Sequence, residues 1–113
     1  MTFSHVHCRV VDLPGAVHWF AEKCGVEASF SDSRMAVLEF GGFVVILDAA
    51  AVDSVVTVGF SSIDCDADCA AMAARGARVL QPPQDRPYGA RVAYLEGPGA
   101  LTIELEQMLP AHA

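Results

Sequence analysis

The sequence predicts an α+β fold built from two copies of a strand–helix–three-strand unit (βαβββ). Apolar and polar residues alternate first at the period of a strand and then at the period of a helix, and this order occurs twice. Each predicted helix is preceded by an aspartate and followed by a glycine, which are common start and end signals. Corresponding positions in the two halves are separated by nearly equal distances, as expected of a diverged internal repeat.

The first predicted element is a strand over residues 3–11. Its alternation puts Phe3, His5, His7 and Arg9 on one face, opposite the row Ser4, Val6, Cys8 and Val10. Asp12 then suits a helix cap and Pro14 suits a first helical turn. Apolar residues at helical spacing follow, and Gly25 is expected to end the helix.

Three short strands are predicted after this helix, at about residues 26–31, 34–40 and 43–48. A polar Ser-Asp-Ser segment separates the first two, and two glycines separate the last two. These strands complete the first unit.

The second unit repeats the order. Asp64 or Asp66 is expected to start its alanine-rich helix, which Gly76 ends. The other predicted elements are a strand at 55–60, a short strand at 77–80, a proline-rich loop at 81–89, and strands at 90–96 and 101–107.

The spacing supports the repeat. The segments from His5 to Asp12 and from Thr57 to Asp64 both span seven residues. We therefore predict a single domain over residues 1–113, with one module at about 3–48 and a second at about 55–107.

Composition excludes several classes of protein. The chain has 113 residues, 53% of them hydrophobic, and a net charge of −7, which argues against binding to a nucleic-acid backbone. No apolar run is long enough to span a membrane, and the first residues do not resemble a signal peptide, so a cytoplasmic location is expected.

The four cysteines form no CxxC pair and are expected to be reduced. We expect them to fill apolar space in the core in preference to forming a metal or redox site.

The repeat also predicts where a site would lie. Each helix needs one sheet face, so the opposite face is left to curve inward and line a cleft. The inward rows are expected to contain Val44, Ile46 and Asp48 in the first half, and Thr57, Gly59, Ser61, Thr102, Glu104 and Glu106 in the second. The repeat makes four positions correspond, namely His5, Ile46, Thr57 and Glu104.

Three segments resemble the vicinal oxygen chelate superfamily, which includes glyoxalase I, bleomycin-resistance proteins and extradiol dioxygenases. They are HVHCRVVDLPGAVHWF near the start, VGFSSIDCDADCAAMAARGARV in the middle and YGARVAYLEGPGALTIELEQ near the end. The last is the most specific, because Ile103-Glu104-Leu105 matches the family's final strand. The preceding turn departs from the family's Asp-Pro-Asp-Gly pattern.

The resemblance implies a curled, mixed sheet around a cavity, and small members of the family are usually homodimers. In metal-dependent members the ligands come from the first and last strand of each module. Carried over by position, His5 matches the first-strand histidine and Glu104 the last-strand glutamate. Ile46 stands where glyoxalase I has a glutamate, and Thr57 stands where it has a histidine or glutamate. Half of the metal ligand set is therefore missing.

Each candidate residue has more than one interpretation. His5 is expected to bond to Glu104 in the cavity, to be a remnant without a role, or to bind metal, in that order. His7 is expected to line the pocket ahead of replacing a missing ligand, and Arg9 either neutralises a ligand or pairs with Glu106. Tyr88 and Arg86 would form a lid or a plain surface loop, and Tyr94 would line the pocket or pack under a helix.

The leading hypothesis is a metal-free protein that binds a small organic ligand as a homodimer, in the way that the bleomycin-resistance subgroup sequesters antibiotics. Its ligand-binding residues would be His5, His7, Arg9, Ile46, Thr57, Tyr88, Thr102 and Glu104.

The alternative is a lyase, isomerase or dioxygenase in which His5 and Glu104 are catalytic. These two would hold one divalent metal (Zn, Ni, Mn or Fe) with a third ligand, which would be His7, Asp48 or a residue of a partner chain. A third possibility is a structural domain whose cavity has collapsed.

Overall fold

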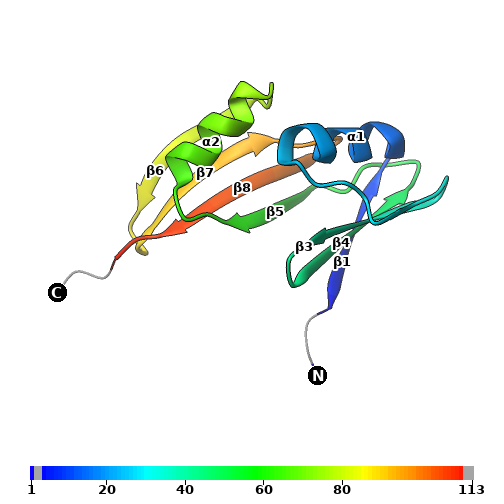
Figure 1. Cartoon of the computed structure of the whole chain (residues 1–113), viewed down its shortest axis with the longest axis horizontal. Helices are drawn as coiled ribbons and strands as arrows, with labels where there is room; N and C mark the ends of the chain where they lie inside the picture. Colours follow the sequence, from blue (N-terminus) through cyan, green and yellow to red (C-terminus); the bar gives the residue numbers. More distant parts are fainter. Residues whose placement is uncertain (2–3, 111–113) are drawn as a thin grey trace. The chain divides into compact units, whose positions relative to one another are not determined.

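The chain forms two compact units, each with one helix and one four-stranded sheet (Figure 1). The computed structural model describes Met1 and residues 4–110. Of these residues, unit 1 contains Met1, 4–56 and 98–100, and unit 2 contains 57–97 and 101–110. Within the described residues, no helix has the length and apolar character needed to cross a membrane.

Unit 1 has the predicted strand–helix–three-strand order. Its elements are β1 (His5–Val10), α1 (Leu13–Cys24), β2 (Phe30–Ser31), β3 (Met35–Phe40) and β4 (Phe43–Ala49). The strand order in the sheet is β1-β4-β3-β2, with β1 parallel to β4 and the other pairs antiparallel. Its core consists of Cys8, Val10, Leu13, Ala16, Phe20, Ala36, Leu38, Val45 and Leu47.

Local chemistry fixes both ends of α1, as the sequence predicts. The carboxylate of Asp12 accepts a hydrogen bond from the backbone N–H of Gly15 at 2.9 Å. A β-carbon at Gly15 would collide with this carboxylate, so the glycine leaves room for the cap. At the other end Gly25 adopts a left-handed conformation with φ of 70°.

Unit 2 repeats this architecture. Its elements are β5 (Val56–Ser61), α2 (Cys65–Ala74), β6 (Val79–Arg86), β7 (Ala90–Glu96) and β8 (Leu101–Met108), in the sheet order β5-β8-β7-β6. Of the two candidate caps, Asp64 is the one used, because its side chain accepts from the backbone N–H of Ala67 at 3.0 Å. The predicted α+β class and the two βαβββ modules are therefore confirmed, as two separate four-stranded sheets. The cavity expected around them stays a prediction.

Two predicted segments were wrong. The strand expected at 26–31 is reduced to Phe30–Ser31, where only two residues pair with β3. The proline-rich loop expected at 81–89 is mostly strand, because β6 extends to Arg86 along β7. β6 lies at the edge of its sheet and its register shifts twice, so Pro82 and Pro83 fit without leaving a donor missing in the sheet interior.

The predicted division of each sheet into two faces is confirmed where the structure describes it. On the strands β4 and β8, the side chains of Val45, Leu47, Ile103 and Leu105 are buried, whereas Val44, Ile46, Thr102 and Glu104 are partly exposed. The side chains packed in the core thus alternate with those on the face away from the helix, which we call the open face of each unit. Phe3, predicted on the open face of unit 1, lies outside the described residues.

Candidate functional site

The open face of unit 1 brings the predicted first-strand row beside β4. In the parallel register His5 lies next to Val44, His7 next to Ile46 and Arg9 next to Asp48. The neighbour of Ile46 is thus His7, not His5, although the repeat made His5 and Ile46 equivalent. On the far side Ile46 is paired with Val37 of β3. Aliphatic side chains therefore form the middle of this face, with polar groups on β1.

His7 and Asp48 form the clearest polar contact on this face. The Nδ1 atom of His7 lies 2.7 Å from Oδ2 of Asp48. Because a carboxylate accepts hydrogen bonds, Nδ1 donates, and a neutral His7 ring would then carry its lone pair on Nε2. About half of the His7 side chain, 53%, is exposed, so the ring is open to a partner.

His5 is held by neighbours from its own strand end. Its Nδ1 atom is 2.9 Å from the hydroxyl of Ser4, and its ring meets the ring of His7 edge-on at 5.0 Å between centroids. The predicted contacts of His5 with Glu104 and of Arg9 with Glu106 would join different units, and they stay predictions. The backbone N–H of Arg9 donates to the hydroxyl of Ser54 at 2.9 Å.

The open face of unit 2 is organised around Glu104. Glu104 of β8 is paired in register with Tyr94 of β7, and the phenol hydroxyl donates a hydrogen bond to the carboxylate. That hydrogen bond, together with burial and the charge of Glu104, raises the pKa of Tyr94 above its usual value. The carboxylate leans over β5, where a β-carbon on Gly59 would come within 3.2 Å of Oε1.

The other predicted residues of unit 2 surround this pair less closely. Thr57 on β5 is exposed, and Thr102 on β8 is half-buried and paired in register with Glu96. Tyr88 lies in the turn after β6 with 63% of its surface exposed. Arg86, the last residue of β6, lies near enough for its positive charge to lower the pKa of Tyr94, against the larger effect of Glu104.

Neither unit alone offers a set of metal ligands. Among Met1 and residues 4–110 there is no group of three histidine, cysteine, aspartate or glutamate side chains close enough to hold a metal ion. In unit 1, His7 and Asp48 are bonded to each other, and the strand neighbour of His7 is the aliphatic Ile46. The donors present within each unit therefore do not fit a divalent metal, which needs three or more such ligands.

The sequence left two roles open for Tyr94, which were to line the pocket or to pack under a helix. The turn around Gly99 could have decided between them, because a hairpin centred on that residue brings Tyr94 opposite Glu104. Side chains opposite each other in an antiparallel pair share a face. Tyr94 therefore belongs to the open face.

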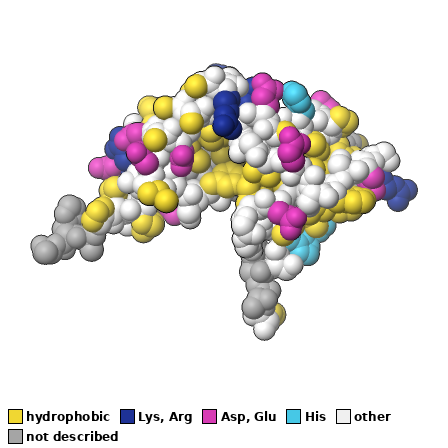
Figure 2. All heavy atoms as spheres, viewed as in Figure 1, with side chains coloured by type: hydrophobic (Ala, Val, Ile, Leu, Met, Phe, Trp, Pro, Cys, Tyr) yellow, Lys and Arg dark blue, Asp and Glu magenta, His cyan; other side chains and the backbone are white. Residues whose placement is uncertain are grey.

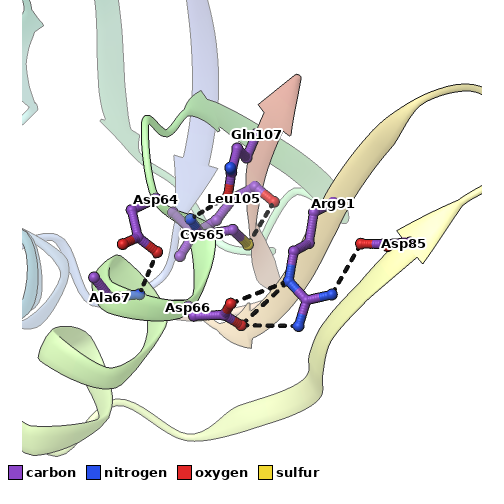
Figure 3. A network of polar contacts seen from close by, with 8 residues as sticks. All are labelled: Asp64, Cys65, Asp66, Ala67, Asp85, Arg91, Leu105 and Gln107. Carbon is purple, nitrogen blue, oxygen red and sulfur yellow. Dashed lines mark hydrogen bonds and ion pairs between the residues drawn. The ribbon is translucent and has the colours of Figure 1, made fainter. Parts of the chain in front are cut away.

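Arg91 is a residue that the sequence did not single out. Its guanidinium donates to Asp66 on α2 through Nε and Nη2, at 3.2 and 3.0 Å, and to Asp85 on β6 through Nη1 at 2.9 Å (Figure 3). Hydrogen bonds to both carboxylates raise its pKa. Arg91 ties α2 to the edge strand on the helix side of the sheet, away from Glu104, so its role is structural.

The cysteines of α2 face the sheet. Cys65 and Cys69 are buried, and the thiol of Cys65 lies 3.7 Å from the carbonyl oxygen of Leu105 (Figure 3). Burial raises the pKa of both thiols, as it does for Cys8 in unit 1. A protonated thiol is a poor nucleophile and metal ligand, which favours the expected filler role.

Unit 1 also contains a cavity of about 280 Å³ at the start of α1, lined in part by Asp12, Trp19, Asp53 and Gly99. The carboxylates of Asp12 and Asp53 both accept hydrogen bonds from backbone N–H groups. Asp12 caps α1, and Asp53 accepts a hydrogen bond from the N–H of Val11 at 2.8 Å. These contacts account for the acidic residues of this cavity.

Comparisons with known proteins cover nearly the whole chain. A family model described as the Glyoxalase/Bleomycin resistance protein/Dioxygenase superfamily matches residues 2–105. No curated protein matches the chain.

Similar solved structures include a glyoxalase/bleomycin resistance protein/dioxygenase from Nocardioides, with a TM-score of 0.84 and 21% identity over 99% of this chain and 86% of that one. TioX from Micromonospora sp. ML1 has a TM-score of 0.79 and 23% identity over 96% of this chain and 100% of that one. Lactoylglutathione lyase from Agrobacterium tumefaciens has a TM-score of 0.82 and 14% identity over 94% of this chain and 92% of that one. At these low sequence identities, the similarity of this chain to the three structures shows a shared fold and not a shared function.

Proposed function

The chain belongs to the glyoxalase/bleomycin resistance protein/dioxygenase superfamily, and from this premise we propose that it is a metal-free protein that binds a small organic molecule. In this proposal it sequesters its ligand without chemistry, as the bleomycin-resistance members of the family do. It acts in the cytoplasm as a homodimer. Each open face contributes proposed ligand-binding residues, namely His5, His7 and Arg9 in unit 1 and Thr57, Thr102 and Glu104 in unit 2.

The observation that carries the proposal is the place of Ile46. It is half-buried on the open face of unit 1, between His7 on one side and Val37 on the other. Metal-dependent glyoxalase I has a carboxylate ligand at this position, by the resemblance above. An aliphatic side chain there cannot bind a metal, but it offers apolar contact to an organic ligand.

The composition of this face supports the same function. Small-molecule sites are mostly apolar walls with a few placed polar groups. Val37, Val44 and Ile46 provide the apolar wall, and the His7–Asp48 pair provides a fixed hydrogen-bonding group next to it.

The first test is the metal content of the purified, untagged chain, measured by elemental analysis before and after soaking in Zn²⁺, Ni²⁺, Mn²⁺ and Fe²⁺. We expect no stoichiometric metal under any of these conditions. Stoichiometric metal that disappears in His5→Ala would contradict the proposal. It would favour the lyase, isomerase or dioxygenase alternative, in which His5 and Glu104 are catalytic.

The second test is a thermal-stability screen of organic compounds against the whole chain. A ligand at about 100 times its Kd stabilises the folded state by about 2.7 kcal/mol, which is easily seen as a rise in Tm. We expect the stabilisation to shrink in His7→Ala and to persist in His18→Ala, the matched control. His18 is an exposed histidine on α1 that pairs with Glu22. Equal losses in both variants would show that the open face is not the binding surface.

A further inference from the structure

Glu104 is a half-buried carboxylate whose position is fixed from two sides. On one side the hydroxyl of Tyr94, its strand neighbour, donates a hydrogen bond to it. On the other side the absence of a side chain at Gly59 lets Oε1 lie low over β5. A tyrosine donor and a glycine together hold this acidic group in place on the open face.

Among the described residues of unit 2, no lysine, arginine or histidine nitrogen forms an ion pair with Glu104. Arg78 and Arg91 are engaged with Glu96, Asp66 and Asp85, and Arg86 acts on Tyr94 as a nearby charge without pairing with Glu104. The predicted contact of Glu104 with His5 would join the two units and stays a prediction. A partly buried carboxylate is stabilised most by a cation that also donates hydrogen bonds.

The charge of the whole chain favours the same kind of ligand. The chain has 14 acidic and 7 basic residues, and the visible surface carries many Asp and Glu side chains and few Lys and Arg (Figure 2). Such a surface attracts cations and repels anions before they reach the site.

We infer that Glu104, held between Tyr94 and Gly59, selects ligands that carry a protonated amine. The ammonium group donates to the carboxylate oxygens that Tyr94 leaves available, and the ring of Tyr94 lines the site beside it. The inference rests on the proposed binding function and specifies its ligand class.

The test compares two probes of similar shape that differ in charge. The isotopically labelled full-length chain is titrated with benzylammonium chloride and, separately, with benzyl alcohol, and the amide signals of Gly59 and Glu104 are followed by NMR. We expect the amine to bind about tenfold more tightly than the alcohol, the size of effect that one charge-assisted contact supports.

Two variants separate the site from general charge. Glu104→Gln is expected to lower the affinity for the amine to that for the alcohol. Glu27→Gln removes the same charge from the exposed segment between α1 and β2 and is expected to leave the preference unchanged. Tyr94→Phe keeps the ring but not the hydroxyl, and is expected to reduce the preference without changing the affinity for the alcohol. The amide spectrum of each variant verifies that it is folded.

Equal affinity for both probes, or a preference that survives in Glu104→Gln, would overturn the inference and leave the binding function intact. The same holds if neither probe binds while neutral compounds stabilise the chain in the thermal screen. If neither probe binds and no compound in the thermal screen stabilises the chain, the proposed function and this inference both fail.

Discussion

At the residue scale, the Tyr94–Glu104 hydrogen bond links the protonation of a phenol to the stability of unit 2. The pKa of Tyr94 is raised chiefly by its hydrogen bond to Glu104. A group whose pKa is higher in the folded state keeps its proton there after the unfolded chain has lost it. The stabilisation is therefore complete below about pH 10, the ordinary pKa of tyrosine, and is lost as the pH rises through the raised value.

We predict that the wild-type chain loses more stability between about pH 9 and pH 11 than the Tyr94→Phe variant does, because phenylalanine has no proton to lose. Urea unfolding curves at several pH values measure this difference. Tyr88→Phe removes an exposed tyrosine from the turn after β6 and serves as the control, with a loss like that of the wild type. A Tyr94→Phe variant with the wild-type pH dependence would show that the hydrogen bond does not contribute.

At the element scale, both helices start at an aspartate that caps the backbone. Asp12 accepts a hydrogen bond from the backbone N–H of Gly15, and Asp64 accepts one from the backbone N–H of Ala67. The two modules therefore cap their helices in the same way. Such caps satisfy backbone donors that have no partner inside the helix. The caps were visible in the sequence because they depend on residues only three positions apart.

We predict that Asp12→Ala destabilises the chain by about 1 kcal/mol, because the N–H of Gly15 loses its acceptor. Chemical denaturation measures the change in the free energy of unfolding. Asp12→Asn keeps an acceptor oxygen at the same place and should cost much less. Equal losses in both variants would assign the effect to charge and not to the cap.

At the scale of the whole molecule, each sheet ends in strands that have a neighbour on one side only. β1 and β5 are terminal in their strand orders, as are β2 and β6, and Val55 and Val56 at the start of β5 are exposed. Exposed sheet edges tend to pair with other strands. The homodimer of the proposed function would satisfy such edges.

We predict that light scattering coupled to gel filtration gives a mass twice that of one chain at micromolar concentration. Dilution should shift the population toward the single chain if the interface is reversible. Val55→Lys places a charge near the start of β5 and is expected to weaken the dimer. Val52→Lys, at an exposed site of unit 1 before β5, is the comparison. A single-chain mass at every concentration would contradict the homodimer.

Most of the fold could be predicted from the sequence, because the signals that specify it are local. Alternation of side chains determined which rows of β1, β4 and β8 face the core, and caps and glycines set the ends of the helices. The candidate site was predictable only in part. The sequence identified His7 and Glu104 as open-face residues but gave neither the contact of His7 with Asp48 nor that of Glu104 with Tyr94. Its prediction that His5 pairs with Glu104 stays a prediction.

The sequence by itself determined the repeat and the two faces of each sheet, since both depend on residue type and on spacing along the chain. The tertiary structure decided what depends on pairing between distant strands. β7 supplies hydrogen bonds that turn most of the proline-rich segment 81–89 into an edge strand. The β1–β4 pairing places His7 within reach of Asp48, 41 residues away along the chain. Register between strands this far apart is set by long-range packing, so no local pattern contains it.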